Sequence, residues 1–217
     1  MGESVEALVA AIAQRLVARG EFLAVAESAA GGRISDALTD RAGCSVWYAG
    51  GAVVYSAASK REMTGLSAEA LKEHGAVSAE TALALAAGAR RRFGTAWGIG
   101  ETGIAGPQTG RRSSKPAGLA YVAVVGPGGI ERTAEVNTGL DSRPENKQQF
   151  AVSRCACSSR ASVRSNACFQ PAVEGGGAVE CRMTRSMPRT TSRAGPRPAI
   201  RSISVCMPSV PSSRAGM

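Results

Sequence analysis

The chain has 217 residues and a net charge of +9, which is enough for one domain of ordinary size and too few for two. No apolar run approaches the roughly 20 residues that a membrane helix needs, and acidic Glu3 and Glu6 near the start are atypical of a signal or transit peptide. The sequence therefore predicts a cytoplasmic protein without a membrane segment.

Charge and cysteine are distributed unevenly. Residues 151–217 hold ten arginines, no lysine and two glutamates, whereas residues 1–150 hold 16 basic and 15 acidic residues. Five cysteines lie in the same tail, and only Cys44 precedes it, which does not resemble a secreted disulfide framework. Because the arginines are not interleaved with aromatic residues as in a stacking platform, a nucleic-acid partner is not expected.

Hydrophobic spacing predicts a helix from Val5 to Val17, ended by Gly20, and then a buried strand from Phe22 to Ala26. A second strand is expected from Ser45 to Tyr55, bent at its glycine pair. Helices are predicted over four further segments: Gly31–Thr39, Ser59–Thr64, Ala68–Glu73 and Ser78–Phe93.

The second half predicts a strand at Thr95–Glu101, a loop at Gly103–Pro116, a hairpin of Gly118–Gly126 with Ile130–Asn137, and a helix from Pro144 to Val152. Strands that alternate with helices indicate a layered α/β domain with some antiparallel pairing. We expect this domain to span residues 1–152. Residues 153–217 lack any structural period, so we expect a low-complexity tail that is disordered or comes from a non-native reading frame.

One stretch, GIGETG at Gly98–Gly103, matches the dinucleotide fingerprint G-x-G-x-x-G. That fingerprint requires glycines that open a helix after a strand. Here Gly98 and Gly100 fall inside the predicted strand, and Gly106 and Pro107 follow where the helix should run. A dinucleotide cofactor is therefore not expected.

Catalytic options are narrowed by the single histidine, His74, which stands near a predicted helix end. No Ser-His or Cys-His pair is available, and no spacing indicates a metal site. A hydrolase would then need a lysine as its base. Lys60 and Lys115 are the candidates, whereas Lys72 and Lys147 are predicted to lie on solvated helix faces.

Ser28 lies between the first strand and the following helix, after Glu27 and before Gly31 and Gly32. Serine is a preferred helix cap, and position alone favours that role. Alternatively, Ser28 is a nucleophile, and free N–H groups at the helix start stabilise an oxyanion, with the glycines allowing close backbone approach.

Five motifs resemble the CinA C-terminal domain family, which is the nicotinamide mononucleotide deamidase (PncC) family. They are AESAAGG with Ser28, GGAVVYSAASK ending at Lys60, EHGAVS, TGIAGP from Thr102, and KPAG from Lys115. They occur in the family's order and at about its spacings, across roughly Glu3 to Val152. The resemblance implies a three-layer α/β/α, Rossmann-like fold with a mixed sheet.

The resemblance also implies metal-independent hydrolysis of the nicotinamide carboxamide, giving nicotinate mononucleotide and ammonia without a cofactor. The family's serine nucleophile falls on Ser28, its lysine base on Lys60 and its motif tyrosine on Tyr55. The lysine must be neutral to accept a proton, so we expect a partly desolvated site. Substrate-binding residues are expected in the serine turn and the glycine-rich loop: Glu27, Gly31, Gly32, Thr102, Gly103, Gly106, Arg111, Arg112 and Lys115.

The expected partner is a small nucleotide, whose phosphate the loop would hold through backbone N–H groups and through Arg111, Arg112 or Lys115. A homo-oligomer is also expected. The chain departs from the family's common Cys-Thr after the serine, because Ala29 and Ala30 stand there. This departure motivates a second hypothesis, a nucleotide- or partner-binding relative with the same fold and weakened chemistry.

Overall fold

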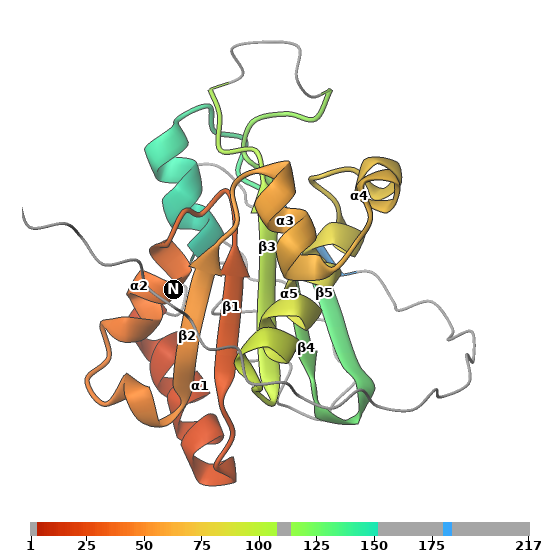
Figure 1. Ribbon diagram of the computed structural model, residues 1–217. Helices are drawn as coiled ribbons and strands as arrows, with labels where there is room; N and C mark the ends of the chain where they lie inside the picture. Colours follow the sequence, from red (N-terminus) through yellow and green to blue (C-terminus); the bar gives the residue numbers. More distant parts are fainter. Residues whose placement is uncertain (1–3, 108–113, 152–179, 184–217) are drawn as a thin grey trace, which may run out of the picture. The chain divides into compact units, whose positions relative to one another are not determined.

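The computed structural model describes residues 4–107 and 114–151, and the backbone of residues 180–183 (Figure 1). The strands are β1 (Leu23–Glu27), β2 (Tyr48–Val53), β3 (Trp97–Gly103), β4 (Leu119–Gly126), β5 (Ile130–Asn137) and β6 (Glu180–Met183). The helices are α1 (Val5–Arg19), α2 (Arg33–Thr39), α3 (Ala57–Thr64), α4 (Ala68–His74) and α5 (Ala79–Phe93). Residues 143–151 are also helical.

The described strands form one mixed sheet in the order β2-β1-β3-β4-β5-β6. β1 lies between β2 and β3 and is parallel to both, whereas β3, β4, β5 and β6 pair antiparallel in succession. β4 and β5 form the antiparallel hairpin that the sequence predicted, so this prediction is confirmed. The sheet thus combines a parallel half, which contains β1, with an antiparallel half.

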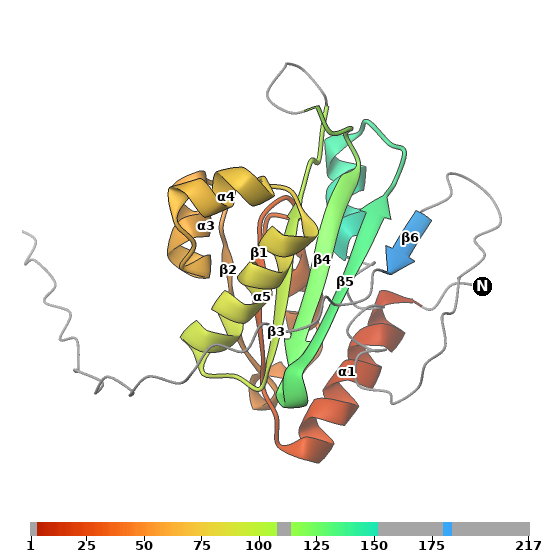
Figure 2. The same ribbon diagram turned by 90° about the vertical axis from the view of Figure 1, so that its right-hand side faces the viewer.

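Helices cover both faces of the sheet (Figure 2). α1, α2 and the 143–151 helix pack on one face, where Val25, Ile99 and Phe150 belong to a single buried cluster. α3 and α5 pack on the other face, where Ala26 and Leu85 share a second cluster. The predicted three-layer α/β/α arrangement is confirmed.

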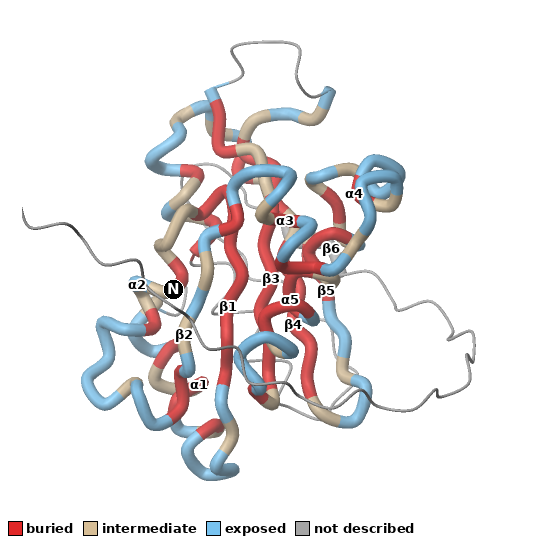
Figure 3. The backbone as a smooth tube through the Cα atoms, in the orientation of Figure 1, coloured by how far each residue is buried: buried red, intermediate tan, exposed pale blue. Residues whose placement is uncertain are grey.

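Burial differs between the centre and the edge of the sheet (Figure 3). All five residues of β1 are buried, because this central strand is covered on both faces, and the run of apolar residues from Phe22 reflects that position. In β2, at the edge, exposed residues alternate with covered ones. β1 and its neighbour β3, which is buried except at its last residue, therefore end in a shielded part of the sheet.

Several predicted boundaries differ from the structure, two of them for a clear local reason. α2 begins at Arg33 and not at Gly31, because Gly31 and Gly32 take left-handed conformations with φ of 60° and 99°. The predicted strand from Ser45 to Tyr55 is shorter, because Cys44–Val46 form a 3₁₀ turn before β2 begins at Tyr48.

Gly98 and Gly100 lie inside β3, as predicted, and bring α5 close to the sheet. A Cβ atom at Gly98 would lie 2.1 Å from the carbonyl oxygen of Ala86, and one at Gly100 would lie 2.0 Å from that of Ala82. These glycines therefore serve helix–strand packing.

The predicted tail, residues 153–217, lies outside the described residues except for 180–183. These four form β6, which pairs antiparallel with β5 from Ala134↔Met183 to Asn137↔Glu180. The sequence analysis did not predict this strand, because the surrounding residues carry no alternating pattern. In the described part of the chain, no helix is both long and apolar enough to cross a membrane.

Candidate active site

The carboxyl ends of β1 and β3 lie next to each other in the middle of the sheet. Ala26 pairs with Gly100, so the residues that follow them, Glu27–Ser28 and Glu101–Thr102, come side by side. The chain leaves β1 toward β2 on one side and returns to β3 on the other, and ligands of open α/β sheets bind at such a point.

Ser28 begins a tight turn that is held from the neighbouring strand. The N–H groups of Ser28 and Ala30 donate to the Oε2 atom of Glu101, at 2.7 and 3.0 Å. Glu101 is fully buried, and Ser28 itself is 3% exposed. Sequence reasoning missed Glu101, because it is 73 residues from Ser28 and lies in a glycine-rich strand.

Glu27 caps the helix that follows this turn. Its carboxylate accepts from the N–H groups of Gly32, Ile34 and Ser35, at 2.8, 3.2 and 3.1 Å, and from the Ser35 hydroxyl at 2.7 Å. Glu27 is fully buried, so the structure gives it a structural role. Its contact with substrate stays a prediction.

These two carboxylates correct one expectation about the serine turn. The N–H groups at the start of α2 were expected to be open to an oxyanion. Those of Gly32, Ile34 and Ser35 instead bind Glu27, and those of Ser28 and Ala30 bind Glu101. The physical reason is that a buried carboxylate requires several hydrogen-bond donors. These N–H groups are therefore not available to an oxyanion.

Lys60 lies in α3 and is buried, with 6% of its surface exposed. Its Nζ atom donates to the carbonyl oxygen of Ala76 at 3.4 Å, and Thr102 Oγ1 donates to the same oxygen at 2.6 Å. Burial lowers the pKa of Lys60 below its usual value. The predicted desolvated lysine is therefore present, next to the end of β3.

Ser28 follows β1, one face of which α3 covers. Ala24 and Ala26 belong to the buried cluster that contains Met63 of α3, and side chains alternate along a strand. Ser28 follows β1 directly, and its N–H group binds Glu101, the residue before Thr102. Ser28, Thr102 and Lys60 thus gather at one corner of the sheet.

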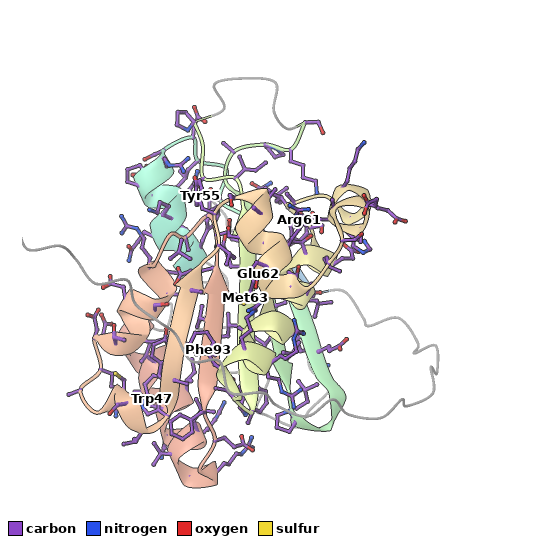
Figure 4. All side chains as sticks on the ribbon, in the orientation of Figure 1. Trp47, Tyr55, Arg61, Glu62, Met63 and Phe93 are labelled. Atoms are coloured by element: carbon purple, nitrogen blue, oxygen red, sulfur yellow. The ribbon has the colours of Figure 1, made fainter. Side chains whose placement is uncertain are left out.

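Tyr55 lies at the border of this corner and is 58% exposed. Arg143 connects it to the glycine-rich loop, because Nη2 donates to Tyr55 Oη and Nη1 donates to the carbonyl oxygen of Gly106 at 2.8 Å. Figure 4 labels Tyr55 at the same end of the sheet as the 143–151 helix, which contains Arg143. Arg143 was not predicted from the sequence, because it stands outside the five motifs.

The glycine-rich loop is described only in part. Lys115 donates through Nζ to the carbonyl oxygen of Val77 and lies 5.2 Å from the centre of the Tyr121 ring. Gly103 is tightly packed, since a Cβ atom there would lie 2.7 Å from that of Ala120. Arg111 and Arg112 lie outside the described residues, so their part in phosphate binding stays a prediction.

Lys147 does not lie on a solvated face, and this prediction is wrong. The side chain is half-buried, and a Cβ atom placed on Gly31 would lie 2.8 Å from Lys147 Nζ. The 143–151 helix turns this lysine toward the serine turn. Lys72 on α4 is exposed, as predicted.

Ala29 and Ala30 are buried in the core cluster on the α1 side. Side chains at these positions therefore face the protein interior, where a longer side chain would contact the core.

Among the described residues, no group of three or more His, Cys, Asp and Glu is placed to hold a metal ion. His74 is exposed at the end of α4, as its helix-end position predicted.

The layers and the corner site define a three-layer α/β domain with a serine turn and a buried lysine at the carboxyl ends of parallel strands. A family model, the CinA C-terminal domain, matches residues 5–157, and the chain belongs to this family.

Similar proteins agree with this assignment. The CinA-like protein of Anaeromyxobacter dehalogenans strain 2CP-C is 46% identical over 149 residues, 69% of this chain and 36% of the relative. That of Parasynechococcus marenigrum strain WH8102 is 47% identical over 133 residues, 61% of this chain and 31% of the relative. The chain thus spans about a third of the length of these curated relatives.

Solved structures show the same fold. The competence/damage inducible protein CihA from Agrobacterium tumefaciens has a TM-score of 0.67 and 34% identity, covering 72% of this chain and 94% of that one. The competence or damage-inducible protein from Enterobacter asburiae has a TM-score of 0.69 and 27% identity, with coverages of 74% and 99%.

Proposed function

We propose that this protein is a cytoplasmic amidohydrolase that converts nicotinamide mononucleotide to nicotinate mononucleotide and ammonia. The observation that carries the proposal is the buried Lys60 beside Thr102, at the strand end where Ser28 begins its turn. A lysine whose pKa is lowered by burial is a suitable base for a serine hydroxyl.

In the proposed reaction, Ser28 Oγ attacks the carboxamide carbon while its proton passes to neutral Lys60. The resulting ammonium then protonates the leaving nitrogen, the C–N bond breaks, and ammonia departs from an ester on Ser28. Water attacks this ester with Lys60 again as base. Nicotinate mononucleotide leaves, and Ser28 recovers its proton.

The negative oxygen of the intermediate needs hydrogen-bond donors, and the two N–H groups bound by Glu101 are already used. We assign this task to Arg143 and Tyr55, which are joined to each other and exposed at the border of the site. Arg143 is also tied to the Gly106 carbonyl, which limits its motion.

The test is ammonia release from the mononucleotide by purified protein. Ser28→Ala and Lys60→Ala are each expected to reduce turnover by roughly 10³-fold or more, as removal of a nucleophile or its base does. Lys72→Ala, which removes an exposed lysine from α4, is the matched control and is expected to retain activity. Turnover that is absent in the unmodified protein, or equal in all variants, contradicts the proposal.

The same purified protein also tests the second hypothesis, a nucleotide- or partner-binding relative with weakened chemistry. Mononucleotide binding measured by calorimetry without ammonia release would support it. The interior position of Ala29 and Ala30 instead favours activity, because these side chains face the core.

A further inference from the structure

Three basic side chains surround the serine turn without an acidic partner. Arg33 Nη1 donates to Gln148 Oε1 at 2.9 Å, and Arg143 donates to Tyr55 and to the Gly106 carbonyl. Lys147 is the third. Within residues 4–107 and 114–151, none of the three forms a salt bridge. Positive charge is therefore concentrated beside the proposed nucleophile.

Lys147 is held in place by its helix. Asn146 and Phe150 of the same helix are fully buried, and Asn146 Nδ2 donates to the carbonyl oxygens of Ala105 and Leu140 at 2.9 and 3.0 Å. These anchors fix the helix against the loop beside the site. The Lys147 ammonium then lies against Gly31, where a Cβ atom would be 2.8 Å from its Nζ atom.

No described residue hydrogen-bonds to the Nζ atom of the half-buried Lys147. The carboxylates beneath the turn, Glu27 and Glu101, bind backbone N–H groups of the turn itself. Glu145 is exposed and two positions away, so it lies on a different face of the helix. A partly desolvated cation without a partner is suited to receive an anionic ligand group.

Lys115, one of the three cations expected to hold the phosphate, donates to the Val77 carbonyl and lies over the Tyr121 ring. We infer that Lys147 forms the subsite for the phosphate group of the substrate. This inference rests on the proposed function for the identity of the ligand, and it assigns phosphate binding to the helix side of the serine turn.

The test compares two ligands in the Ser28→Ala background, which blocks turnover: nicotinamide mononucleotide and the same nucleoside without its phosphate. Lys147→Gln is expected to weaken calorimetric binding of the mononucleotide by about 10- to 100-fold and to leave nucleoside affinity unchanged, as for loss of one charged hydrogen bond. Lys147→Arg keeps the charge and is expected to retain affinity. Lys72→Gln is the matched control, and circular dichroism checks that each variant is folded.

Unchanged mononucleotide affinity in Lys147→Gln, or an equal loss for both ligands, overturns the subsite. Inorganic phosphate is the second probe, and its binding is expected to depend on Lys147 as well. If the unmodified protein releases no ammonia but binds phosphate through Lys147, the proposed function fails and the subsite stands. If it binds neither the mononucleotide nor inorganic phosphate, the subsite is overturned whatever its activity.

Discussion

At the scale of single residues, Lys60 connects burial to chemistry. Its ammonium loses solvation inside the protein, which lowers its pKa below the ordinary value of 10.5. Because only the neutral amine accepts the proton of Ser28, we expect kcat/KM to rise with pH through this lowered pKa. Rate measurements from pH 6 to 10 would show this rise in kcat/KM, and Lys60→Arg should abolish both the rise and the activity. A flat profile in the unmodified protein would contradict a lysine base.

The same burial predicts a stability change. The unfolded lysine keeps its proton up to about its ordinary pKa of 10.5, whereas the folded one loses it earlier, so stability rises with pH between these two pKa values. Lys60→Met removes the buried charge and should raise the free energy of unfolding at pH 7, with a smaller gain at pH 10. Urea unfolding at both pH values measures this, and Lys72→Met should change little, because Lys72 is exposed.

Sequence could indicate Ser28 and Lys60, because each stands in a local motif. It could not indicate Glu101 or Arg143, because their roles depend on partners 73 and 88 residues away. It assigned Lys147 to a solvated face, because its neighbours Gln148 and Gln149 are polar. Only the packing of the 143–151 helix turns that side chain toward Gly31.

At the scale of elements, the predicted strands and helices followed from hydrophobic period and capping residues. Ser4, Ser67 and Ser78 each accept a backbone N–H bond at the start of a helix, as their positions predicted for Ser78. The distance between elements could not be predicted in this way. This distance depends on which glycines in β3 face a helix. The alternation of side chains along a strand does not identify which helix lies opposite them.

Gly100 illustrates that dependence and carries a prediction. Because a Cβ atom there would lie 2.0 Å from a backbone oxygen of α5, Gly100→Ala must push the helix from the sheet. We expect a loss of about 1–3 kcal/mol in the free energy of unfolding, as for other overpacked sites. Activity should also fall, since Glu101 is the next residue. An unchanged urea midpoint would show that α5 moves freely.

Phe150 carries the prediction for the last described helix. Its ring is fully buried in the cluster with α1 residues. Phe150→Ala should lower the free energy of unfolding by about 3–5 kcal/mol, as large core truncations do. Phe93→Ala is the control, because Phe93 is 38% exposed and should cost much less. Similar losses in both variants would mean that the helix contributes little to the core.

At the scale of the whole molecule, the open question is what the residues after 151 contribute. The sequence predicted a tail without structure, yet residues 180–183 pair with β5. β5 carries buried Ala134 and Val136 in the paired stretch, so its outer edge borders the core. A paired edge shields backbone groups that would otherwise face solvent. A domain that is complete at residue 152 and a domain that needs β6 predict different stabilities for a shortened chain.

Two truncations separate them, one ending at Val152 and one at Ser186. If β6 contributes to the domain, the longer chain should melt a few degrees higher, since each kcal/mol shifts Tm by about 2–4 °C for proteins of this size. The gain should disappear when Cys181→Pro is introduced into the longer chain, because proline removes a backbone donor from the strand. Equal melting temperatures for the two truncations would instead support a domain that is complete at residue 152, with a tail that adds nothing to its stability.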